Sequence, residues 1–396
     1  MHFSHLNTAA GILRLYGGEE PFHHFIKDYF RQHKKHGSKD RKRISGLCYA
    51  YFRLGPSFPG TTMEEKILLG LFLCAVRPDE LLENLRPGWN AAVQQPLKDK
   101  CAVAGVAYEA LTIFPFTDAL SETIDKETFA HAHLQQPDLF IRLRPGYEKK
   151  VLEKLDKAGE AWRRLDETCI AFSNAAKIDT LLELDKEAVV QDYSSQRVGA
   201  FLQSAVDSSQ QPIRDVWDCC AASGGKSILA KDMLGDIRLT VSDVRKPILV
   251  NLEKRFSAAG IKKYKSMVLD LAKMEPAGLS AQVLAKAGSS FDLIIADVPC
   301  SGSGTWGRTP ESLSFFKPAE IDRYQQLQKQ IVSNALPLLK KGRCFLYITC
   351  SVFKKENEDM AAFIEENGDL RLLRMETLKG YDKKADTMFA ALFVNE

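Results

Sequence analysis

The sequence predicts an α/β protein with a mostly parallel, doubly wound sheet in its carboxyl-terminal half. The first observation is the alternation of short apolar runs with helical segments from about residue 213 onward. The second is an amino-terminal region in which apolar residues recur at helical spacing. The third is the stretch between these two regions, in which strand-like and helix-like patterns are mixed. We therefore expect three parts, spanning residues 1–130, 131–205 and 206–396.

Residues 1–130 are expected to be all-helical. The apolar residues recur at i, i+3, i+4 and i+7 in FHHFIKDYFRQ, DRKRISGLCYAYFRL and TTMEEKILLGLFLCAV. Thr62 and Glu65 can form a capping box before the third segment. Residues 31–43 hold seven Lys or Arg, two His and one Asp. Such a run can grip phosphates, or it can be a solvated loop between helices.

Residues 131–205 are expected to form a small α/β unit. LFIRLRPG is typical of a strand, and EKKVLEKLDKAGEAW of an amphipathic helix. DTLLELDKEAVVQDY shows further strand-like alternation. The polar, turn-prone segment SAVDSSQQPIRD then marks a boundary.

Six apolar runs are expected to form the strands of the large sheet. They are RDVWDCC, IRLTVSDV, KYKSMVLD, FDLIIADVPC, CFLYITC and TMFAALFV. Helical segments separate most of them, which favours parallel pairing through crossover connections. The last run lies just before Glu396, so we expect no RNA-binding domain after it.

The composition is that of an ordinary globular protein, with 45% hydrophobic and 27% charged residues and a net charge of +3. No run approaches the roughly 18 apolar residues of a membrane span, and no secretory signal is visible, so we expect a cytoplasmic protein without membrane partners. The nine cysteines form no CxxC pair and no Cys/His cluster at zinc-ligand spacing. We therefore expect no metal site and reduced thiols.

The segment DCCAASGGKS at 218–227 follows a strand and opens a helix, as a cofactor-binding loop does. A Walker A loop would need a glycine at Cys220, and a GxGxxG fingerprint is absent. The remaining interpretation is a nucleoside-cofactor loop of the S-adenosylmethionine type. Carboxylates at three later strand ends, Asp243, Asp270 and Asp297, would line the same crevice.

Two cysteines, Cys300 and Cys350, also stand where predicted strands end. A thiolate that adds to carbon 6 of a pyrimidine makes carbon 5 nucleophilic toward a methyl group, and Asp297 could hold the N3/N4 edge of the ring. The loop 297–300 reads DVPC and not [DNS]PP[YFW], which favours carbon methylation over amine methylation. The residues alone do not rank the two cysteines.

Four motifs resemble those of the RsmB/Fmu/Sun (NOL/NOP/Sun) family of RNA cytosine-5 methyltransferases. They are VQDYSSQ at 190–196, DCCAASGGKS at 218–227, DVPCSGSGTWGRTP at 297–310 and YITCSVFKKENE at 347–358. The resemblance covers about 135–396 and implies a Rossmann-like methyltransferase sheet. HGSKDRKRISGLCYAYFRLG at 36–55 is similar to the NusB-like domain of ribosomal-RNA members, with a generic helical bundle as the alternative.

Carried over by motif position, the resemblance implies a role for each site residue. Cys350 is the nucleophile that forms a covalent adduct with cytosine, and Cys300 assists its release. S-adenosylmethionine binding falls on Cys220, Ala221, Ala222, Ser223, Gly224, Gly225, Lys226, Asp243, Asp270 and Asp297. Residues 131–205 correspond to a small RNA-contacting region.

Two positions depart from the family pattern. Ser223 replaces a proline in the first motif, which loosens the φ restraint of the loop. Gly307 replaces the first of two arginines, so that Arg308 stands alone. DNA cytosine methyltransferases are similar in scheme but use the cysteine after the proline, in a PCQ context, whereas this chain has Pro299-Cys300-Ser301 and a second cysteine at 350.

We therefore expect an RNA methyltransferase that forms 5-methylcytosine in 16S ribosomal RNA. The alternatives are a tRNA methyltransferase with the same chemistry and a catalytically silent RNA-binding assembly factor. The target cytosine, the base that removes the carbon-5 proton and the oligomeric state are not predicted.

Overall fold

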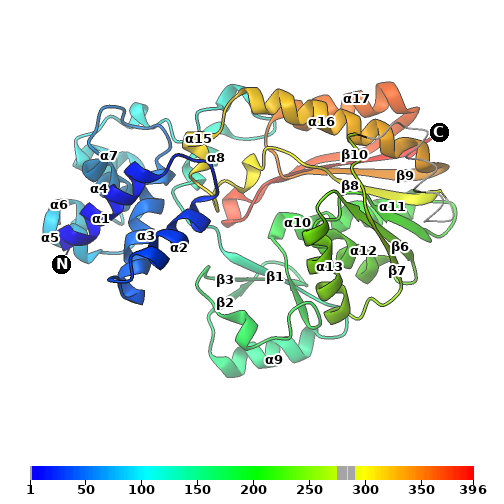
Figure 1. The fold of residues 1–396 in the computed structure, drawn as a ribbon, viewed down its shortest axis with the longest axis horizontal. Helices are drawn as coiled ribbons and strands as arrows, with labels where there is room; N and C mark the ends of the chain where they lie inside the picture. The colour runs from blue at the N-terminus through cyan, green and yellow to red at the C-terminus, as the bar shows by residue number, and fades with distance from the viewer. Residues whose placement is uncertain (1, 274–282, 284–289) are drawn as a thin grey trace. The chain divides into compact units, whose positions relative to one another are not determined.

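A computed structural model describes residues 2–273, 283 and 290–396 of the chain (Figure 1). The chain divides into two compact units. The first comprises Met1–Asp118, Asp125–Gln136 and Thr305–Lys317, and the second comprises Ala119–Ile124, Pro137–Gly304 and Pro318–Glu396. The units differ from the predicted parts at three short segments: 119–124 lie with the second unit, and 131–136 and 305–317 lie with the first.

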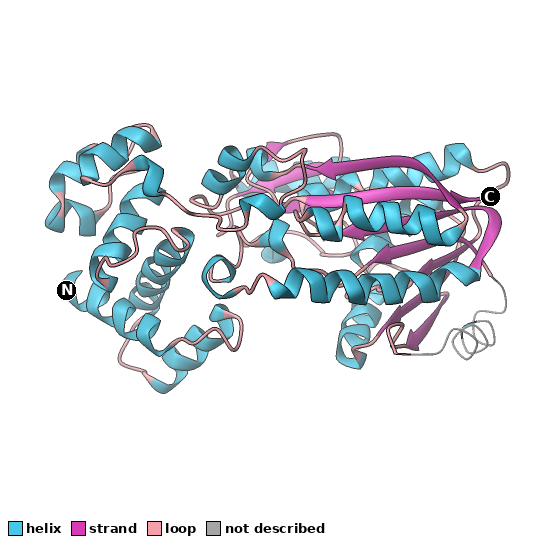
Figure 2. Cartoon of the chain, turned by 90° about the horizontal axis from the view of Figure 1, so that it is seen from above, coloured by secondary structure: helices cyan, strands magenta, loops and turns pink. Residues whose placement is uncertain are grey.

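The first unit is helical in its described residues, as expected (Figure 2). Its helices are α1 (His2–Leu15), α2 (Phe22–Gln32), α3 (Ser38–Arg53), α4 (Met63–Cys74), α5 (Glu80–Leu85), α6 (Pro87–Ala91), α7 (Leu97–Ala104), α8 (Lys126–Ala132) and α15 (Ser312–Phe315). The Thr62 hydroxyl caps α4 by accepting a hydrogen bond from the Glu65 N–H at 3.3 Å.

The segment 305–317 directly follows the loop of Cys300 in the chain, yet it packs within the helical unit. The Phe22 N–H donates to Glu311 Oε1 at 3.0 Å. The Phe315 ring meets Tyr16 edge to face, with centroids 5.2 Å apart. Because such aromatic contacts bury large apolar areas, the segment is an integral part of this helical core.

The second unit contains a small antiparallel sheet in the order β2-β3-β1-β4. Its elements are β1 (Leu139–Leu143), α9 (Glu148–Ala158), β2 (Trp162–Arg164), β3 (Cys169–Phe172) and β4 (Ala188–Val190). The first strand and the helix are where the sequence predicted them. The alternation in 179–193 was a poorer guide, since only three of these residues form a strand, and β2 and β3 were not predicted.

The second unit also contains a seven-stranded sheet in the order β10-β11-β9-β8-β5-β6-β7. Its strands are β5 (Asp215–Asp218), β6 (Arg238–Asp243), β7 (Tyr264–Val268), β8 (Phe291–Asp297), β9 (Leu339–Thr349), β10 (Leu370–Leu378) and β11 (Met388–Asn395). The five strands from β9 to β7 in this order pair in parallel, whereas β11 and β10 are antiparallel additions at one side. The predicted doubly wound sheet is therefore confirmed, with β10 as an unpredicted strand.

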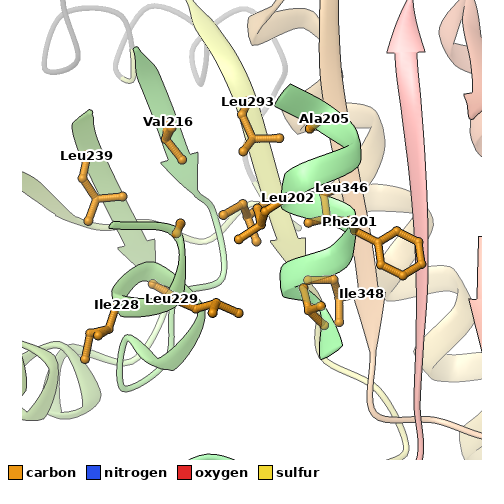
Figure 3. Packing of buried hydrophobic residues seen from close by; sticks show 14 of the residues in the cluster. Phe201, Leu202, Ala205, Val216, Ile228, Leu229, Leu239, Leu293, Leu346 and Ile348 are labelled. Atoms are coloured by element: carbon orange, nitrogen blue, oxygen red, sulfur yellow. The ribbon is translucent and has the colours of Figure 1, made fainter. Parts of the chain in front are cut away.

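Helices cover both faces of this sheet (Figures 1 and 2). One face carries α11 (Gly199–Ser208), α12 (Gly225–Leu234) and α13 (Lys246–Ala258), and the other carries α16 (Ala319–Ala335) and α17 (Glu358–Gly368). Successive strand residues enter opposite cores: Phe345 and Tyr347 pack with α16 and α17, and Leu346 and Ile348 with the other helices. Figure 3 shows the core between the sheet and helices α11 and α12, which includes Leu346 and Ile348.

The strand order reverses between β5 and β8, because β6 and β7 extend the sheet on one side and β9 on the other. Loops that leave the carboxyl ends of strands on the two sides of such a point diverge, and the space between them is where open α/β sheets bind ligands. The loops after β5 and β8 therefore flank the favoured ligand position.

The last residue of β5, Asp218, is a buried acid. Asp218 is fully buried, and its Oδ2 accepts a hydrogen bond from the Ser227 hydroxyl at 2.6 Å. Its Oδ1 has no hydrogen-bond partner in the described part of the chain. Burial raises the pKa of Asp218 to about 7, so this carboxyl group changes charge near neutral pH.

Replacement of Asp218 by Asn is expected to remove a pH-dependent loss of stability. The carboxyl group ionises near 3.8 in the unfolded chain but only near about 7 in the folded one. Wild type therefore loses stability as pH rises through this window, because unfolding releases a proton. Relative to wild type, Asp218→Asn should gain up to about 4 kcal/mol of unfolding free energy from about pH 4 to pH 7, as urea unfolding measures.

Asp292 offers the matched control. Burial raises its pKa, but hydrogen bonds from the backbone of Asp215 and Arg214 outweigh this effect and place its pKa below the ordinary value. The stabilisation that ionised Asp292 gives the fold is thus lost only at pH below the pKa that this residue has in the unfolded chain. Asp292→Asn should therefore destabilise the protein by a constant amount from about pH 5 to pH 8. Parallel stability curves for wild type and Asp218→Asn would refute the assignment of the pH dependence to Asp218.

Candidate active site at the carboxyl ends of the strands

The loop after β5 is shaped by two left-handed residues. Ala222 has φ +45° and Gly224 has φ +85°. A Cβ on Gly224 would lie 2.7 Å from Phe256 Cε1, so only glycine fits there. The Ala221 N–H donates to the Ser242 carbonyl at 2.9 Å, and the Ala222 N–H donates to Asp243 Oδ2 at 3.0 Å. The loop is therefore held against the end of β6 before α12 begins.

Asp243 lies at the end of β6 and is nearly fully buried. Burial alone would raise the pKa of its carboxyl group. Hydrogen bonds from the side chain and backbone of Arg245 outweigh this effect, so the pKa is below the ordinary value. The Arg245 Nε lies 3.0 Å from Asp243 Oδ1, and its guanidinium is largely exposed. Asp243 is thus a charged carboxylate that holds the loop of Ala222.

Asp270 follows β7 and is partly exposed. Its Oδ1 accepts a hydrogen bond from the Ala272 N–H at 3.1 Å, and its Oδ2 lies 3.4 Å from Lys273 Nζ. These contacts are local, so the described structure ties Asp270 to its own turn rather than to the loop of Gly224.

Lys226 links the glycine loop to the next strand end. Its Nζ donates to Ser195 Oγ at 2.7 Å and forms an ion pair with Asp297 Oδ2 at 3.1 Å. The Lys226 side chain is 10% exposed and that of Asp297 29%. Two of the predicted site residues therefore contact each other directly, with Ser195 of the VQDYSSQ motif as a third member.

Cys300 and Cys350 lie side by side, as their positions at strand ends predicted. β8 and β9 pair in parallel with Asp297 opposite Ile348. Pairing continues past the end of β8, since the Val298 N–H donates to the Ile348 carbonyl at 3.1 Å. The two Sγ atoms are 3.2 Å apart, and both cysteines are free thiols.

The loops that carry the two thiols share one buried carboxylate. Glu356 is fully buried, and its Oε2 accepts hydrogen bonds from the Ser301 N–H at 2.8 Å and from Gln328 Nε2 at 3.0 Å. Its Oε1 accepts from the Ser351 hydroxyl at 2.8 Å. Burial raises the pKa of Glu356. A single side chain thus ties the residue after each cysteine to the same point.

Gly304 and Tyr347 also hold the backbone near Cys350. The Gly304 N–H donates to the Cys350 carbonyl at 2.9 Å, and a Cβ on Gly304 would lie 1.9 Å from the Thr387 carbonyl oxygen. The Tyr347 hydroxyl donates to the Glu356 carbonyl at 2.8 Å. These close approaches fix the backbone on both sides of Cys350.

The surroundings of Cys300 favour its protonated form. The hydrogen bond with Cys350 and, after it, burial hold the pKa of Cys300 well above the ordinary value. Cys300 therefore keeps its proton at neutral pH. This thiol lies within hydrogen-bonding distance of the Cys350 sulfur, with 3.2 Å between the two Sγ atoms.

Several residues of this site were not predicted to have a role. Glu356 and Ser195 lie within the quoted ENE and SSQ motifs, so motif membership was the only available signal. Asp218 likewise is the first residue of the quoted DCCAASGGKS motif. Gln328 on α16 carries no such signal, because a single Gln in a helix is common.

The basic run 31–43 spans the end of α2 and the start of α3 in the helical unit. The exposed members are Arg31, Lys34, Lys35, Lys39 and Lys42. Arg43 instead forms a two-pronged ion pair with Asp79. The exposed part of the run is thus free of the burial that would prevent contact with phosphates.

No helix in the described chain is long and apolar enough to cross a membrane. Within the same residues, no group of three or more His, Cys, Asp or Glu side chains is suited to hold a metal ion.

Glu356→Gln is expected to separate the two cysteine loops. The amide keeps the size of the side chain but replaces one acceptor oxygen by a donor, which leaves the Ser301 N–H or the Ser351 hydroxyl without its partner. An unsatisfied buried donor costs about 1–3 kcal/mol. Cross-linking of Cys300 to Cys350 by dibromobimane, mapped by mass spectrometry, should fall severalfold.

Glu358→Gln is the control for this variant. The Glu358 carboxylate accepts a hydrogen bond from the Ser121 hydroxyl at 2.8 Å. It should lower stability while leaving the cross-linking yield near wild type. Equal yields for wild type and Glu356→Gln would show that Glu356 does not set the thiol separation.

Residues 207–392 match the family described as 16S rRNA methyltransferase RsmB/F. A Bacillus subtilis protein described as a probable ribosomal RNA small subunit methyltransferase B is 31% identical over 185 residues, which cover 46% of this chain and 38% of that protein. The Shewanella oneidensis ribosomal RNA small subunit methyltransferase B is 29% identical over 56% of this chain and 49% of its own. The alignments thus span half or less of each relative.

Two solved structures share the fold. The structure of PH0851 aligns with 98% of this chain and 96% of its own, at a TM-score of 0.68 and 18% identity. NSun6 from Pyrococcus horikoshii with SFG covers 71% of this chain and 97% of its own, at a TM-score of 0.57 and 13% identity. Residues 207–392, slightly less than half of the chain, thus match the RsmB/F methyltransferase family that the sequence motifs resemble.

Proposed function

We propose that this protein is an S-adenosylmethionine-dependent RNA methyltransferase that forms 5-methylcytosine in 16S ribosomal RNA. The observation that carries the proposal is the pair of thiols 3.2 Å apart at the ends of neighbouring parallel strands. The family of residues 207–392 and the names of the curated relatives support methyl transfer to small-subunit ribosomal RNA.

The residues of the glycine loop fit S-adenosylmethionine. The backbone of Cys220 to Gly225 offers a close approach without bulky side chains, and no pyrophosphate-binding fingerprint is present. In our proposal, Asp243 accepts hydrogen bonds from the ribose hydroxyls after the Arg245 side chain moves away from it. Asp270 contacts the base. Lys226 and Asp297 complete the site toward the cysteines. When bound, the cofactor supplies an electrophilic methyl group.

Cys350 is the proposed nucleophile. Its thiolate adds to carbon 6 of cytosine, and the electron pair moves to carbon 5, which takes the methyl group. After carbon 5 loses its proton, the carbon–sulfur bond breaks and the thiolate of Cys350 leaves. Asp297 holds the N3/N4 edge of the ring during these steps.

Cys300 is the proposed assistant for release. Its raised pKa keeps the thiol protonated beside Cys350. It can therefore donate to the sulfur of Cys350 as negative charge returns to it, which lowers the barrier to bond breakage.

The substrate reaches the site only as an unstacked nucleotide, because a paired base hides carbon 6 from the thiol. We propose that the small sheet and the exposed lysines and arginine of 31–43 hold the RNA backbone. Mapping of 5-methylcytosine by bisulfite sequencing, with and without the gene, decides the substrate. Loss of a mark in 16S rRNA supports the proposal, and loss in tRNA would reassign the substrate.

Cys350→Ala is expected to abolish methyl transfer. Removal of a covalent nucleophile costs about 10³-fold or more in rate. Transfer of a tritiated methyl group to ribosomal RNA measures the effect. Cys74→Ala, in the helical unit, should retain the wild-type rate. Transfer by Cys350→Ala at the wild-type rate would exclude this cysteine as the nucleophile, and no transfer by the wild type would favour a silent assembly factor.

Cys300→Ala is expected to accumulate a covalent protein–RNA adduct. Attack by Cys350 remains possible, but the leaving thiolate has lost its donor. Denaturing gel electrophoresis with labelled RNA should show a slow-migrating band that is absent in Cys300→Ala/Cys350→Ala. Turnover by Cys300→Ala without such a band would contradict the release role of Cys300.

A further inference from the structure

The residue that departs from the family motif, Ser223, is held by an arginine. Arg255 of α13 directs its Nη1 to both the carbonyl oxygen and the hydroxyl oxygen of Ser223, each at 3.0 Å. The Arg255 side chain is only 21% exposed. The guanidinium therefore fixes the backbone and the side chain of this loop residue at once.

The other edge of the same guanidinium contacts Asp185, in the turn that precedes β4 of the small sheet. Asp185 Oδ1 accepts from Arg255 Nη2 at 2.7 Å and from Nε at 3.0 Å. Such two-pronged pairs fix the plane of the guanidinium as well as its position. Asp185 thus determines how Arg255 presents its remaining nitrogen to Ser223.

Asp185 is itself held in place independently of Arg255. It adopts a left-handed conformation with φ +63°. Its N–H donates to the Ala188 carbonyl at 2.7 Å, and its carbonyl accepts from Arg144 Nη1 at 2.9 Å. Aspartate adopts this conformation more readily than most residues, and the two backbone hydrogen bonds hold it there. The carboxylate is therefore a fixed anchor.

Arg144 extends the same support to both helices beside the loop. It pairs with Asp232 of α12 at 2.6 Å and donates to the carbonyl of Ala259, at the end of α13, at 2.8 Å. α12 begins at the glycine loop, and α13 carries Arg255. The small sheet thus anchors the loop through Arg255 and its flanking helices through Arg144.

The loop needs such a restraint because Ser223 lies between two left-handed residues. Ala222 and Gly224 both have positive φ, so the chain reverses direction sharply on either side. A proline at position 223 would limit φ through its ring, whereas serine does not. The Arg255 contacts supply a restraint of a different kind at the same residue.

We propose that Arg255, oriented by Asp185, is a positioning residue that holds the cofactor loop in its binding conformation. It acts through Ser223 and does not touch the ligand. The proposal rests on the proposed function in one respect, that the loop binds S-adenosylmethionine. It assigns to the small sheet a part in cofactor binding in addition to any contact with RNA.

The test is a cycle of variants of the full chain: Arg255→Ala, Ser223→Pro and the double variant. Calorimetric titration with S-adenosylhomocysteine measures binding without turnover. Arg255→Ala should raise the Kd about tenfold, which corresponds to about 1.4 kcal/mol. In the Ser223→Pro background the same change should raise the Kd less than about twofold, because the ring already restrains the loop.

Two further variants separate positioning from general destabilisation. Arg255→Lys can reach Ser223 or Asp185 but not both, so its Kd should lie between wild type and Arg255→Ala. Lys254→Ala, an exposed neighbour on α13, should bind as wild type. With saturating S-adenosylmethionine the kcat of Arg255→Ala should return to within about threefold of wild type, whereas a merely unfolded fraction would lower kcat throughout.

Hydrogen exchange of the unliganded protein tests the loop itself. The amides of Ala221, Ala222 and Gly224 should exchange faster in Arg255→Ala and return toward wild type in the double variant. Unchanged exchange, or equal effects of Arg255→Ala with serine and with proline, would overturn the proposal. Failure of wild type to bind S-adenosylhomocysteine would refute the proposed function instead, and the exchange result would still decide the role of Arg255.

Discussion

The separation of the two thiols depends on one buried carboxylate. Glu356 receives hydrogen bonds from Ser301, Ser351 and Gln328, that is, from the loop after each of two strands and from the helix that covers them. These three residues donate from neutral groups, and burial, which outweighs their hydrogen bonds, raises the pKa of Glu356. Because a carboxylate has two oxygens at fixed spacing, the donors it joins cannot drift apart independently.

Parallel pairing brings the remaining site residues to the same edge. Hydrogen bonds continue beyond the regular strands: the Cys219 N–H donates to the Ile295 carbonyl at 2.9 Å, and the Ala221 N–H to the Ser242 carbonyl at 2.9 Å. Each loop is thus registered against its neighbour before it diverges. The order of strands then places the glycine loop beside the strand that ends at Asp297, and Lys226 joins the two.

Sequence patterns predicted the elements whose residues are uniform along their length. The buried cores of β8 and β9, LIIA and CFLYI, were evident because their residues are all apolar, as buried parallel strands require. β10 was missed because arginines and Glu376 alternate irregularly with leucines along LRLLRMETL, where one register shift occurs. β2 has only three residues, two of them exposed arginines. Such short strands are defined by their partner and not by their own composition.

The candidate site shows the same limit at the level of side chains. Cysteines and aspartates at strand ends were predicted because strand ends can be located in a sequence. Glu356, Gln328 and Arg255 contact residues as far as 70 positions away in the chain, and these distant partners follow from tertiary packing alone. The segment 305–317 is a similar case, because nothing in its sequence marks the passage from the sheet to the helical unit.

The substitution at Ser223 illustrates how one restraint can replace another. A proline ring limits φ in the unfolded chain too, so its effect on the loop needs no partner and is insensitive to salt. The contacts of Arg255 form only in the folded protein and depend on Asp185, but the ion pair is mostly buried and therefore weakly screened. A covalent restraint acts on one residue, whereas this ionic one also joins the loop to a second sheet. With serine at this position, the loop is joined through Arg255 to the turn of Asp185 in the same unit.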